Sequence, residues 1–260
     1  MQNLGIVLYT QGNNKRNLKN CLKSLTNFKD KVIVVCDGTL PSIDELEGFE
    51  TKEYKSTIFA SGCYNHGLRH LLNKGVEHFF IVNDNVMVLE DKLFDDYINV
   101  NSQTKIGFMA SSTESDDPYG KGKNNKLTLE LKEGYQLLLN KGFNGYLLYL
   151  TRETIKKVGF FDERYKGAFE GSDYYKRASD KGVTSYFGWF ADVKGSSNNI
   201  LYQTNRPDSI HPVFNSDTVE DRIIKSMKVF NLKFKTQPQN LFEIYSQKDV
   251  VQKLKNLSSR

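Results

Sequence analysis

The chain has 260 residues, of which 38% are hydrophobic and 26% charged, a composition typical of a globular protein with a sizeable core. The net charge of +5 favours acidic ligands but is too small for a dedicated nucleic-acid binder. The three cysteines indicate neither a disulfide framework nor a zinc ribbon. No segment approaches the roughly 20 apolar residues that cross a bilayer, and no cleavable leader is evident. We therefore expect a cytoplasmic protein without an integral membrane segment.

The first hundred residues alternate between strand-like and helix-like patterns. Apolar runs predict strands at 4–8, 31–36, 53–55 and 78–82. Apolar residues at helical spacing predict helices at 18–25, 62–72 and 91–98. Strands that alternate with helices form parallel sheets, and such sheets bind ligands at the carboxyl ends of their strands.

The remaining residues continue the alternation and then become helical. Further strands are predicted at 106–110, 145–150 and 184–190. Helices are predicted at 152–158 and in the segment that ends at Ala178. The polar stretch 111–125 predicts a long loop of the kind that forms lids or substrate loops. From about residue 219, two basic amphipathic helices are expected.

Two polar residues follow the early strands. Asp37 ends the strand 31–36, where a carboxylate can accept hydrogen bonds from a base or a ribose, or simply cap a turn. Asn65, in the sequence Asn65-x-Gly67, lies where a helix N-terminus could offer its N–H groups to phosphate, or where the chain only turns.

The residues Asn83, Asp84 and Asn85 directly follow the buried strand 78–82. Their oxygen-bearing side chains suit a divalent ion on a diphosphate, because Mg²⁺ and Mn²⁺ prefer hard oxygen ligands. A polar turn is the alternative interpretation of the same three residues.

Two carboxylates follow an aromatic and acidic segment in the second half of the chain. Glu170 or Asp173 could be the general base that deprotonates an acceptor hydroxyl, whereas Asp173 could instead cap the helix that follows. Farther along, Arg206 could reach a diphosphate, with an ordinary surface position as the alternative.

Three stretches combine these features in an informative order. The opening reads GIVLYTQGNNKRNLKNCLKSL and then KVIVVCDGT. The second stretch is ASGCYNHGLRHLLNKGVEHFFIVNDNVMV, and the third is NGYLLYLTRETIKKVGFFDERYKGAFEGSDYYKRASDKG. Together they resemble the GT-A glycosyltransferases of family 2, including rhamnosyltransferase-like members, over residues 1 to about 195.

The resemblance implies an α/β protein with a GT-A fold, which is a Rossmann-like, mostly parallel central sheet with flanking helices. The GT-A domain would span 1–215, with a nucleotide-sugar-binding half at 1–100 and an acceptor half at 101–215. A helical C-terminal extension would occupy 216–260.

The resemblance also implies a function, namely the transfer of a sugar from a UDP- or dTDP-type donor to a hydroxyl acceptor, with inversion. The acceptor could be a glycan, a lipid-linked molecule or a DNA base. Thr10 and Asp37 would hold the nucleoside, and Asn83, Asp84 and Asn85 would face the ribose and a diphosphate bound to Mn²⁺ or Mg²⁺. Additional donor-binding residues would be Asn65 and Arg206, and the metal ligands would be Asp84, Asn85 and His211.

Three departures from the family pattern bear on these roles. Cys36 stands where the family often has an aspartate, so Asp37 is left to bind the base. Asn83 and Asn85 replace the carboxylates of the DxD motif, and because amide oxygens coordinate more weakly than carboxylates, we expect either low metal affinity or no need for metal. Gly171 replaces an aspartate of the acidic catalytic motif, which leaves Glu170 or Asp173 as the base.

Two other functions are open on the sequence alone. The acceptor could be a hydroxymethylated base in DNA, with phosphates contacted by the basic residues Lys121, Lys123, Lys126, Lys225, Lys228, Lys233 and Lys235. Alternatively, the departures from the motifs could indicate a nucleotide-sugar-binding protein that catalyses no transfer.

Overall fold

The computed structural model describes residues 3–111, 126–140, 145–184, 190–203 and 219–236. Its centre is a six-stranded sheet in the order β3-β2-β1-β4-β9-β6. In that order, the strands are Glu50–Glu53, Val32–Cys36, Leu4–Thr10, His78–Asn83, Leu147–Thr151 and Phe108–Ala110. Only β9 runs antiparallel to its neighbours, so the predicted mostly parallel α/β sheet is confirmed.

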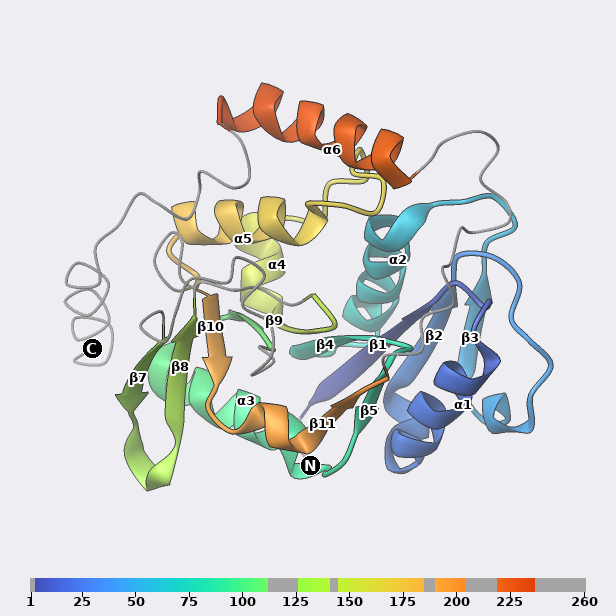
Figure 1. Ribbon diagram of the computed structural model, residues 1–260. Coiled ribbons are helices and arrows are strands. Elements are labelled where there is room, and N and C mark those ends of the chain that lie inside the picture. Colours follow the sequence, from blue (N-terminus) through green and yellow to red (C-terminus); the bar gives the residue numbers. More distant parts are fainter. Residues whose placement is uncertain (1–2, 112–125, 141–144, 185–189, 204–218, 237–260) are drawn as a thin grey trace.

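The three central strands β1, β2 and β4 are buried on both faces because they are almost entirely apolar. Alternate residues of β1 enter different core layers: Ile6 and Leu8 pack on one face and Val7 on the other. The helices α1 (Lys15–Ser24) and α3 (Lys92–Thr104) cover the first face. The helices α2 (Phe59–Asn73), α4 (Arg152–Val158) and α5 (Glu170–Asp180) cover the second (Figure 1).

Gly67 lets α2 lie directly on the central strand. A Cβ atom at this position would be 2.5 Å from Cγ1 of Val7, a distance that real Cβ contacts do not reach. The glycine of the Asn65-x-Gly67 sequence therefore has a packing reason, independent of any ligand.

Two smaller sheets complete the structure, and the sequence did not predict the first of them. It is antiparallel and contains β7 (Lys126–Glu130), β8 (Gln136–Asn140) and β10 (Phe190–Val193). The other pairs β5 (Val86–Val88) with β11 (Ile200–Tyr202). Of the polar loop predicted at 111–125, all but the first residue lies outside the described residues.

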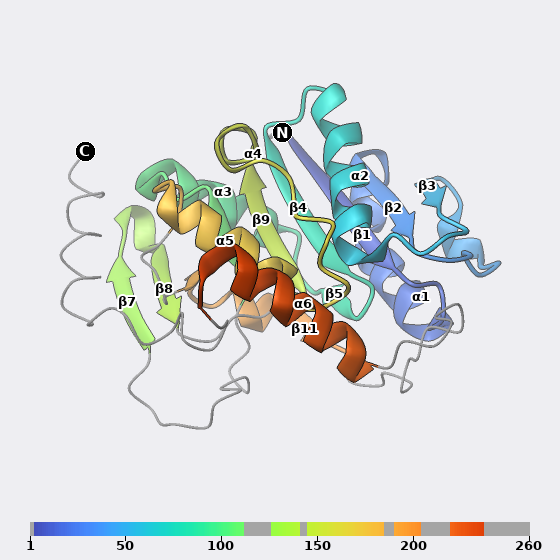
Figure 2. The same ribbon diagram turned by 90° about the horizontal axis from the view of Figure 1, so that it is seen from above.

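The helix α6 (Val219–Phe234) confirms the first of the two predicted C-terminal helices, whereas the second lies outside the described residues. It forms an outer layer above α5 (Figures 1 and 2). Phe230 of α6 packs on Tyr165, and the Ser226 hydroxyl accepts a hydrogen bond from the Lys166 backbone N–H at 3.1 Å. Within the part of the chain that the structure describes, no helix is long and apolar enough to cross a membrane.

Candidate functional site

A cavity of about 390 Å³ lies at the carboxyl ends of β1 and β4. The helices α1, α2, α5 and α6 all begin at this cavity, and the segments after β4 and before β9 complete its wall. Helix N-termini carry unpaired N–H groups and a partial positive charge. The position of the cavity therefore agrees with the ligand site expected for a parallel sheet, and its helix ends favour an anionic ligand.

Thr10 holds the carboxylate of Asp84 at the base of the cavity. The register pairs Tyr9 with Asn83 across β1 and β4, which places the next residues of the two strands side by side. The Thr10 hydroxyl donates to Oδ2 of Asp84 at 2.5 Å, and Thr10 itself is buried. Asp84 lines the cavity, whereas Thr10 lies behind it and supports it.

Asn85 presents an unsatisfied oxygen at the same place. The residue is only 7% exposed, and its Oδ1 has no hydrogen-bond partner among the described residues. Its neighbour Asn83 also lines the cavity, but its Oδ1 accepts a hydrogen bond from the Tyr64 hydroxyl at 3.2 Å. A buried amide oxygen without a donor suits a cation or a donor group of a ligand.

The chemistry of this donor set fits one divalent ion that shares its coordination with a ligand. The described residues contain no cluster of three or more His, Cys, Asp or Glu side chains arranged to hold a metal. Asp84 and Asn85 would therefore supply two oxygens, and phosphate and water would supply the others, as is usual for Mg²⁺.

Asp37 does not line the cavity but fixes the start of α2. Its carboxylate accepts hydrogen bonds from the backbone N–H groups of Ile58 at 2.8 Å and Phe59 at 3.1 Å, and the residue is 1% exposed. Two of the backbone donors at this helix start are thus satisfied by Asp37. The expected contact between Asp37 and a nucleoside stays a prediction.

Two phenylalanines that line the cavity have left-handed backbone conformations. Phe59 begins α2 with φ +59°, and Phe169 precedes α5 with φ +65°. This conformation costs a residue other than glycine about 1–2 kcal/mol. The ring of Phe169 packs near Phe230 of α6, whereas the ring of Phe59 lies 4.7 Å from Nζ of Lys166.

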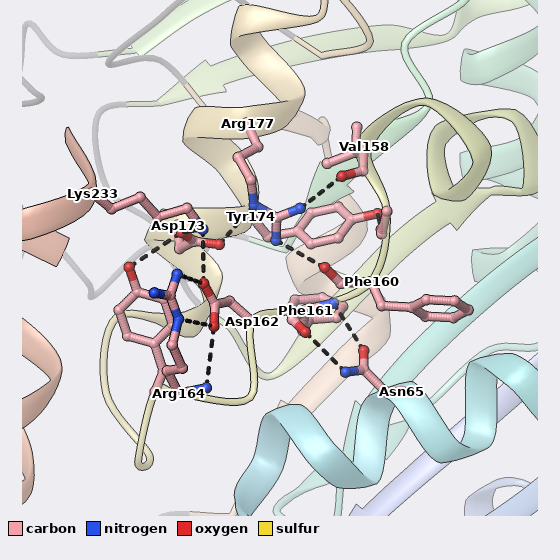
Figure 3. A network of polar contacts seen from close by, with 12 residues as sticks. Asn65, Val158, Phe160, Phe161, Asp162, Arg164, Asp173, Tyr174, Arg177 and Lys233 are labelled. Atoms are coloured by element: carbon pink, nitrogen blue, oxygen red, sulfur yellow. Dashed lines mark hydrogen bonds and ion pairs between the residues drawn. The ribbon is translucent and has the colours of Figure 1, made fainter. Parts of the chain in front are cut away.

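Asn65 connects α2 to the segment that precedes α5, and it does not line the cavity. Its Nδ2 donates to the Phe161 carbonyl at 2.9 Å and its Oδ1 accepts from the Phe161 N–H at 2.8 Å (Figure 3). Nδ2 also donates to Oε1 of Glu163 at 2.8 Å. The predicted role of Asn65 in donor binding is not supported by this position.

Glu170 lines the cavity as the first residue of α5. Its Oε2 is buried and has no hydrogen-bond partner in the described part of the chain. Burial raises the pKa of this carboxyl above its usual range, and a hydrogen bond from its own backbone N–H opposes the effect. A carboxylate in such surroundings is a good proton acceptor for a ligand hydroxyl.

Asp173 lies one turn farther along α5, is fully buried, and does not line the cavity. Its Oδ2 accepts from Nε of Arg177 at 2.8 Å, and its Oδ1 accepts from Nζ of Lys233 at 2.5 Å and from the Tyr165 hydroxyl at 3.2 Å (Figure 3). Oδ1 therefore joins α5 to α6 through Lys233, whereas Oδ2 is engaged by Arg177 within α5. Both oxygens of Asp173 have partners, in contrast to Oε2 of Glu170.

The same network includes Asp162, which accepts hydrogen bonds from Arg164 at 2.6 Å and from Lys233 at 2.9 Å (Figure 3). The hydrogen bond from Arg164 is the main reason that the pKa of Asp162 lies well below its usual range, and Lys233 adds to the effect. Lys233 thus joins two carboxylates of the α5 region, so this lysine is engaged within the protein.

The cavity contains residues that sequence reasoning missed. Arg222, in the first turn of α6, contributes a positive charge, and no local pattern in the sequence indicated it. Gln11, Asn13 and Asn14 line the cavity from the loop after β1, which the sequence showed only as rich in turn residues. The predicted ligands Arg206 and His211 lie outside the described residues.

The sequence matches no protein-family model and has no significant match among curated proteins. Solved structures do match. TarS 1–349 of S. aureus in complex with UDP-GlcNAc aligns with a TM-score of 0.54 at 12% identity, over 99% of this chain and 79% of that one. GalNAc-T7 with UDP, GalNAc and Mn²⁺ aligns with a TM-score of 0.51 at 9% identity, over 69% of this chain and 41% of that one.

A third match is the mannosyltransferase PcManGT from Pyrobaculum calidifontis, with a TM-score of 0.49 at 16% identity, over 69% of this chain and 52% of that one. The chain spans about half the length of this protein and about two fifths of the length of GalNAc-T7. The alignments with TarS and GalNAc-T7, together with the sheet order, show that the chain has the GT-A fold. At these identities they establish the fold alone, so membership in family 2 stays a prediction.

Proposed function

We propose that the chain is an inverting glycosyltransferase that moves a sugar from a UDP- or dTDP-type donor to a hydroxyl acceptor. The observation that carries the proposal is that one cavity collects Asp84, Asn85 and Glu170 from two distant parts of the sequence. Asn85 and Glu170 each contain a buried side-chain oxygen without a partner among the described residues. The fold supports the proposal, since TarS and GalNAc-T7 have solved structures with UDP-GlcNAc and with UDP.

The donor diphosphate would lie beside Asp84 and Asn85, where these residues would hold Mn²⁺ or Mg²⁺. Such an ion, when bound, neutralises the negative charge that develops on the leaving diphosphate. The chain adds its own positive field through Arg222 and through the start of α5, which has no side-chain cap. Gly171 and Ser172 border the cavity there, in the first turn of α5, where the backbone N–H groups of a helix can bind an anion.

Glu170 would act as the general base. As the acceptor oxygen bonds to the anomeric carbon, the bond from that carbon to the diphosphate breaks, and the acceptor proton passes to the Glu170 carboxylate. A raised pKa makes the carboxylate a stronger proton acceptor at neutral pH. Asp173 serves poorly in this role because two cations and a hydroxyl already occupy its oxygens.

Calorimetric titration with a panel of nucleoside diphosphates and their sugars, with Mn²⁺ and then with EDTA, tests the donor site. We expect one nucleotide to bind selectively and EDTA to weaken it. Absence of binding for every member under both conditions would refute the proposal and leave only the fold.

A second measurement separates a transferase from a protein that only binds the donor. Release of nucleoside diphosphate from the selected donor is followed for the wild type and for Glu170→Gln. We expect the variant to bind the donor normally and to turn over at least a hundredfold more slowly, since general bases contribute about 10²–10⁴ in rate. Donor binding without turnover in the wild type, across candidate acceptors, would favour the non-catalytic alternative.

A further inference from the structure

We infer that Gln203 is a positioning residue, which orients the side chain of Asn85 toward the divalent ion by holding the backbone on both sides of it. The inference rests on the proposed function and adds to it a residue that does not itself line the cavity. Gln203 directly follows β11, the strand that lies beside β5 (Figure 1).

The pairing of β11 with β5 brings Gln203 to Asn85. In the antiparallel register Tyr202 lies opposite Val86, so the residue after Tyr202 comes to the residue before Val86. The Gln203 backbone N–H donates to the Asn85 carbonyl at 2.8 Å, which extends the contact between the two strands to the edge of the cavity. The peptide unit that follows the Cα atom of Asn85 is thereby held.

The side chain of Gln203 holds the peptide unit that precedes the same Cα atom. Its Nε2 donates to the Asp84 carbonyl at 3.3 Å. Because peptide units are planar, fixing the two that flank Asn85 determines the direction in which its side chain leaves the backbone. The Asp84 carboxylate has a restraint of its own in Thr10, whereas Oδ1 of Asn85 has no hydrogen-bond partner among the described residues. The direction of the Asn85 side chain therefore depends on its backbone.

The same amide group of Gln203 also reaches α1. Its Nε2 donates to the Asn17 carbonyl at 3.1 Å, and its Oε1 accepts from Nδ2 of Asn20 at 2.8 Å. Asn17 is buried, belongs to the first turn of α1 and lines the cavity. A glutamine amide has two N–H donors, and here they serve the carbonyls of Asp84 and Asn17. Gln203 thus fixes the backbone before Asn85 against a helix as well as against β11.

The proposed ion would be sensitive to this restraint. Asp84 and Asn85 would supply only two of its oxygens, and phosphate and water would supply the others, so a change in the direction of one protein ligand removes half of the protein's contribution. Residues that orient metal ligands without touching the metal typically contribute about 10–100-fold to metal affinity.

Gln203→Met tests the inference, because it keeps the length of the side chain and removes its amide. Mn²⁺ is titrated into the protein saturated with the nucleoside diphosphate that the wild type binds best, and free Mn²⁺ is followed by electron paramagnetic resonance. We expect the variant to bind Mn²⁺ about tenfold or more weakly. In EDTA it should bind the same nucleotide as the wild type does, which a general loosening of the cavity would not allow.

A double-variant cycle with Asn85→Ala identifies the group through which Gln203 acts. If Gln203 acts through Asn85, adding Gln203→Met to Asn85→Ala should cost much less Mn²⁺ affinity than it costs in the wild type, because the oxygen that it orients is already absent. Equal losses in the two backgrounds would overturn the inference.

Gln103→Met is the matched control. Gln103 of α3 also binds the backbone of a distant segment, since its Nε2 donates to the Lys132 carbonyl at 3.3 Å and its Oε1 accepts from the Lys132 N–H at 2.7 Å. It does not line the cavity, so the control should keep the wild-type Mn²⁺ affinity.

The inference is overturned if Gln203→Met binds Mn²⁺ as the wild type does, or if nucleotide affinity in EDTA falls in step with Mn²⁺ affinity. A wild type that binds the nucleotide but no Mn²⁺ also overturns it and leaves the donor site standing. A wild type that binds no nucleotide at all refutes the proposed function itself.

Discussion

Glu170 is a buried carboxyl whose environment favours its neutral form. Because its pKa is raised in the folded state, the stability that this group contributes is present below the unfolded pKa of about 4.3 and is lost as the pH rises through the folded value. We therefore expect Glu170→Gln to melt at a higher temperature than the wild type near neutral pH, and to lose this advantage at about pH 4.

Thermal unfolding across this pH range measures the effect, with Glu47→Gln as the control at an exposed position. The variant would then be more stable and inactive at the same pH, as expected for a functional group held in an unfavourable environment. Equal melting temperatures at neutral pH would show that Glu170 is not destabilised by its surroundings.

Asn85 supplies an amide oxygen where the DxD pattern has a carboxylate. Replacement by Asp adds a negative charge beside Asp84, so we expect Asn85→Asp to bind Mn²⁺ on the order of tenfold more tightly in the presence of the selected nucleotide. Without metal, repulsion between the two carboxylates should lower the melting temperature.

Calorimetric titration with Mn²⁺ provides the comparison. Asn13→Asp is the control, because it adds a carboxylate to the same cavity from the loop after β1. If both variants gain the same Mn²⁺ affinity, the gain reflects general charge and not a ligand at position 85.

At the scale of elements, α6 is attached to α5 by a charged contact as well as by an apolar one. Replacing Lys233 by Met leaves fully buried Asp173 with Arg177 as its remaining cation. Because breaking a buried ion pair is strongly unfavourable, we expect a loss of about 3 kcal/mol in the free energy of unfolding.

Urea unfolding at neutral pH measures this loss, and Lys228→Met provides the control at an exposed position of the same helix. The control should change stability by no more than about 0.5 kcal/mol. The backbone amides of α6 should also exchange hydrogen faster in the Lys233 variant than in the wild type. Nucleotide binding should be weaker as well, because Arg222 of the cavity belongs to the same helix. Unchanged exchange in α6 would contradict the attachment.

The contact of α2 with β1 allows no side chain at Gly67. In Gly67→Ala the new methyl group would meet Val7, and we expect a loss of about 1–3 kcal/mol from overpacking. Val7→Ala should lower stability alone, but the double variant should be more stable than the sum of the two losses predicts, because the two positions are in contact. Urea unfolding of the four proteins tests the coupling, and strict additivity would refute it.

At the scale of the whole molecule, the sequence predicted those parts of the fold that depend on local pattern. The apolar runs of β1, β2 and β4 are buried on both faces, so they stand out without knowledge of their neighbours. The hairpin of β7 and β8 was missed because each strand has only five residues, and the three successive leucines of β8 hide its alternation of partly and fully buried residues. The insertion of β9 between β4 and β6 depends on pairing between distant segments, which no local pattern contains.

The residues of the candidate site also differ in how far the local sequence indicates their role. Asp84 and Asn85 directly follow β4 and Glu170 begins α5, so the sequence could indicate all three as candidates, and the structure brings them to one cavity. Asn65, Asp37 and Asp173 are also polar and close to those elements, yet their partners across the fold engage them in structural contacts. Whether a polar residue lines the cavity or makes a structural contact therefore depends on its partners, which only the folded structure shows.

The place of β9 also has a consequence for how the chain folds. β6 precedes β9 in the sequence but can join the sheet only through it, so β4 has an unpaired edge until residues 147–151 are in place. Nearly seventy residues separate the paired positions of β4 and β9, and such long-range contacts form slowly. During that interval an apolar strand edge is open to other chains, and β4 is therefore the segment through which incomplete chains would aggregate.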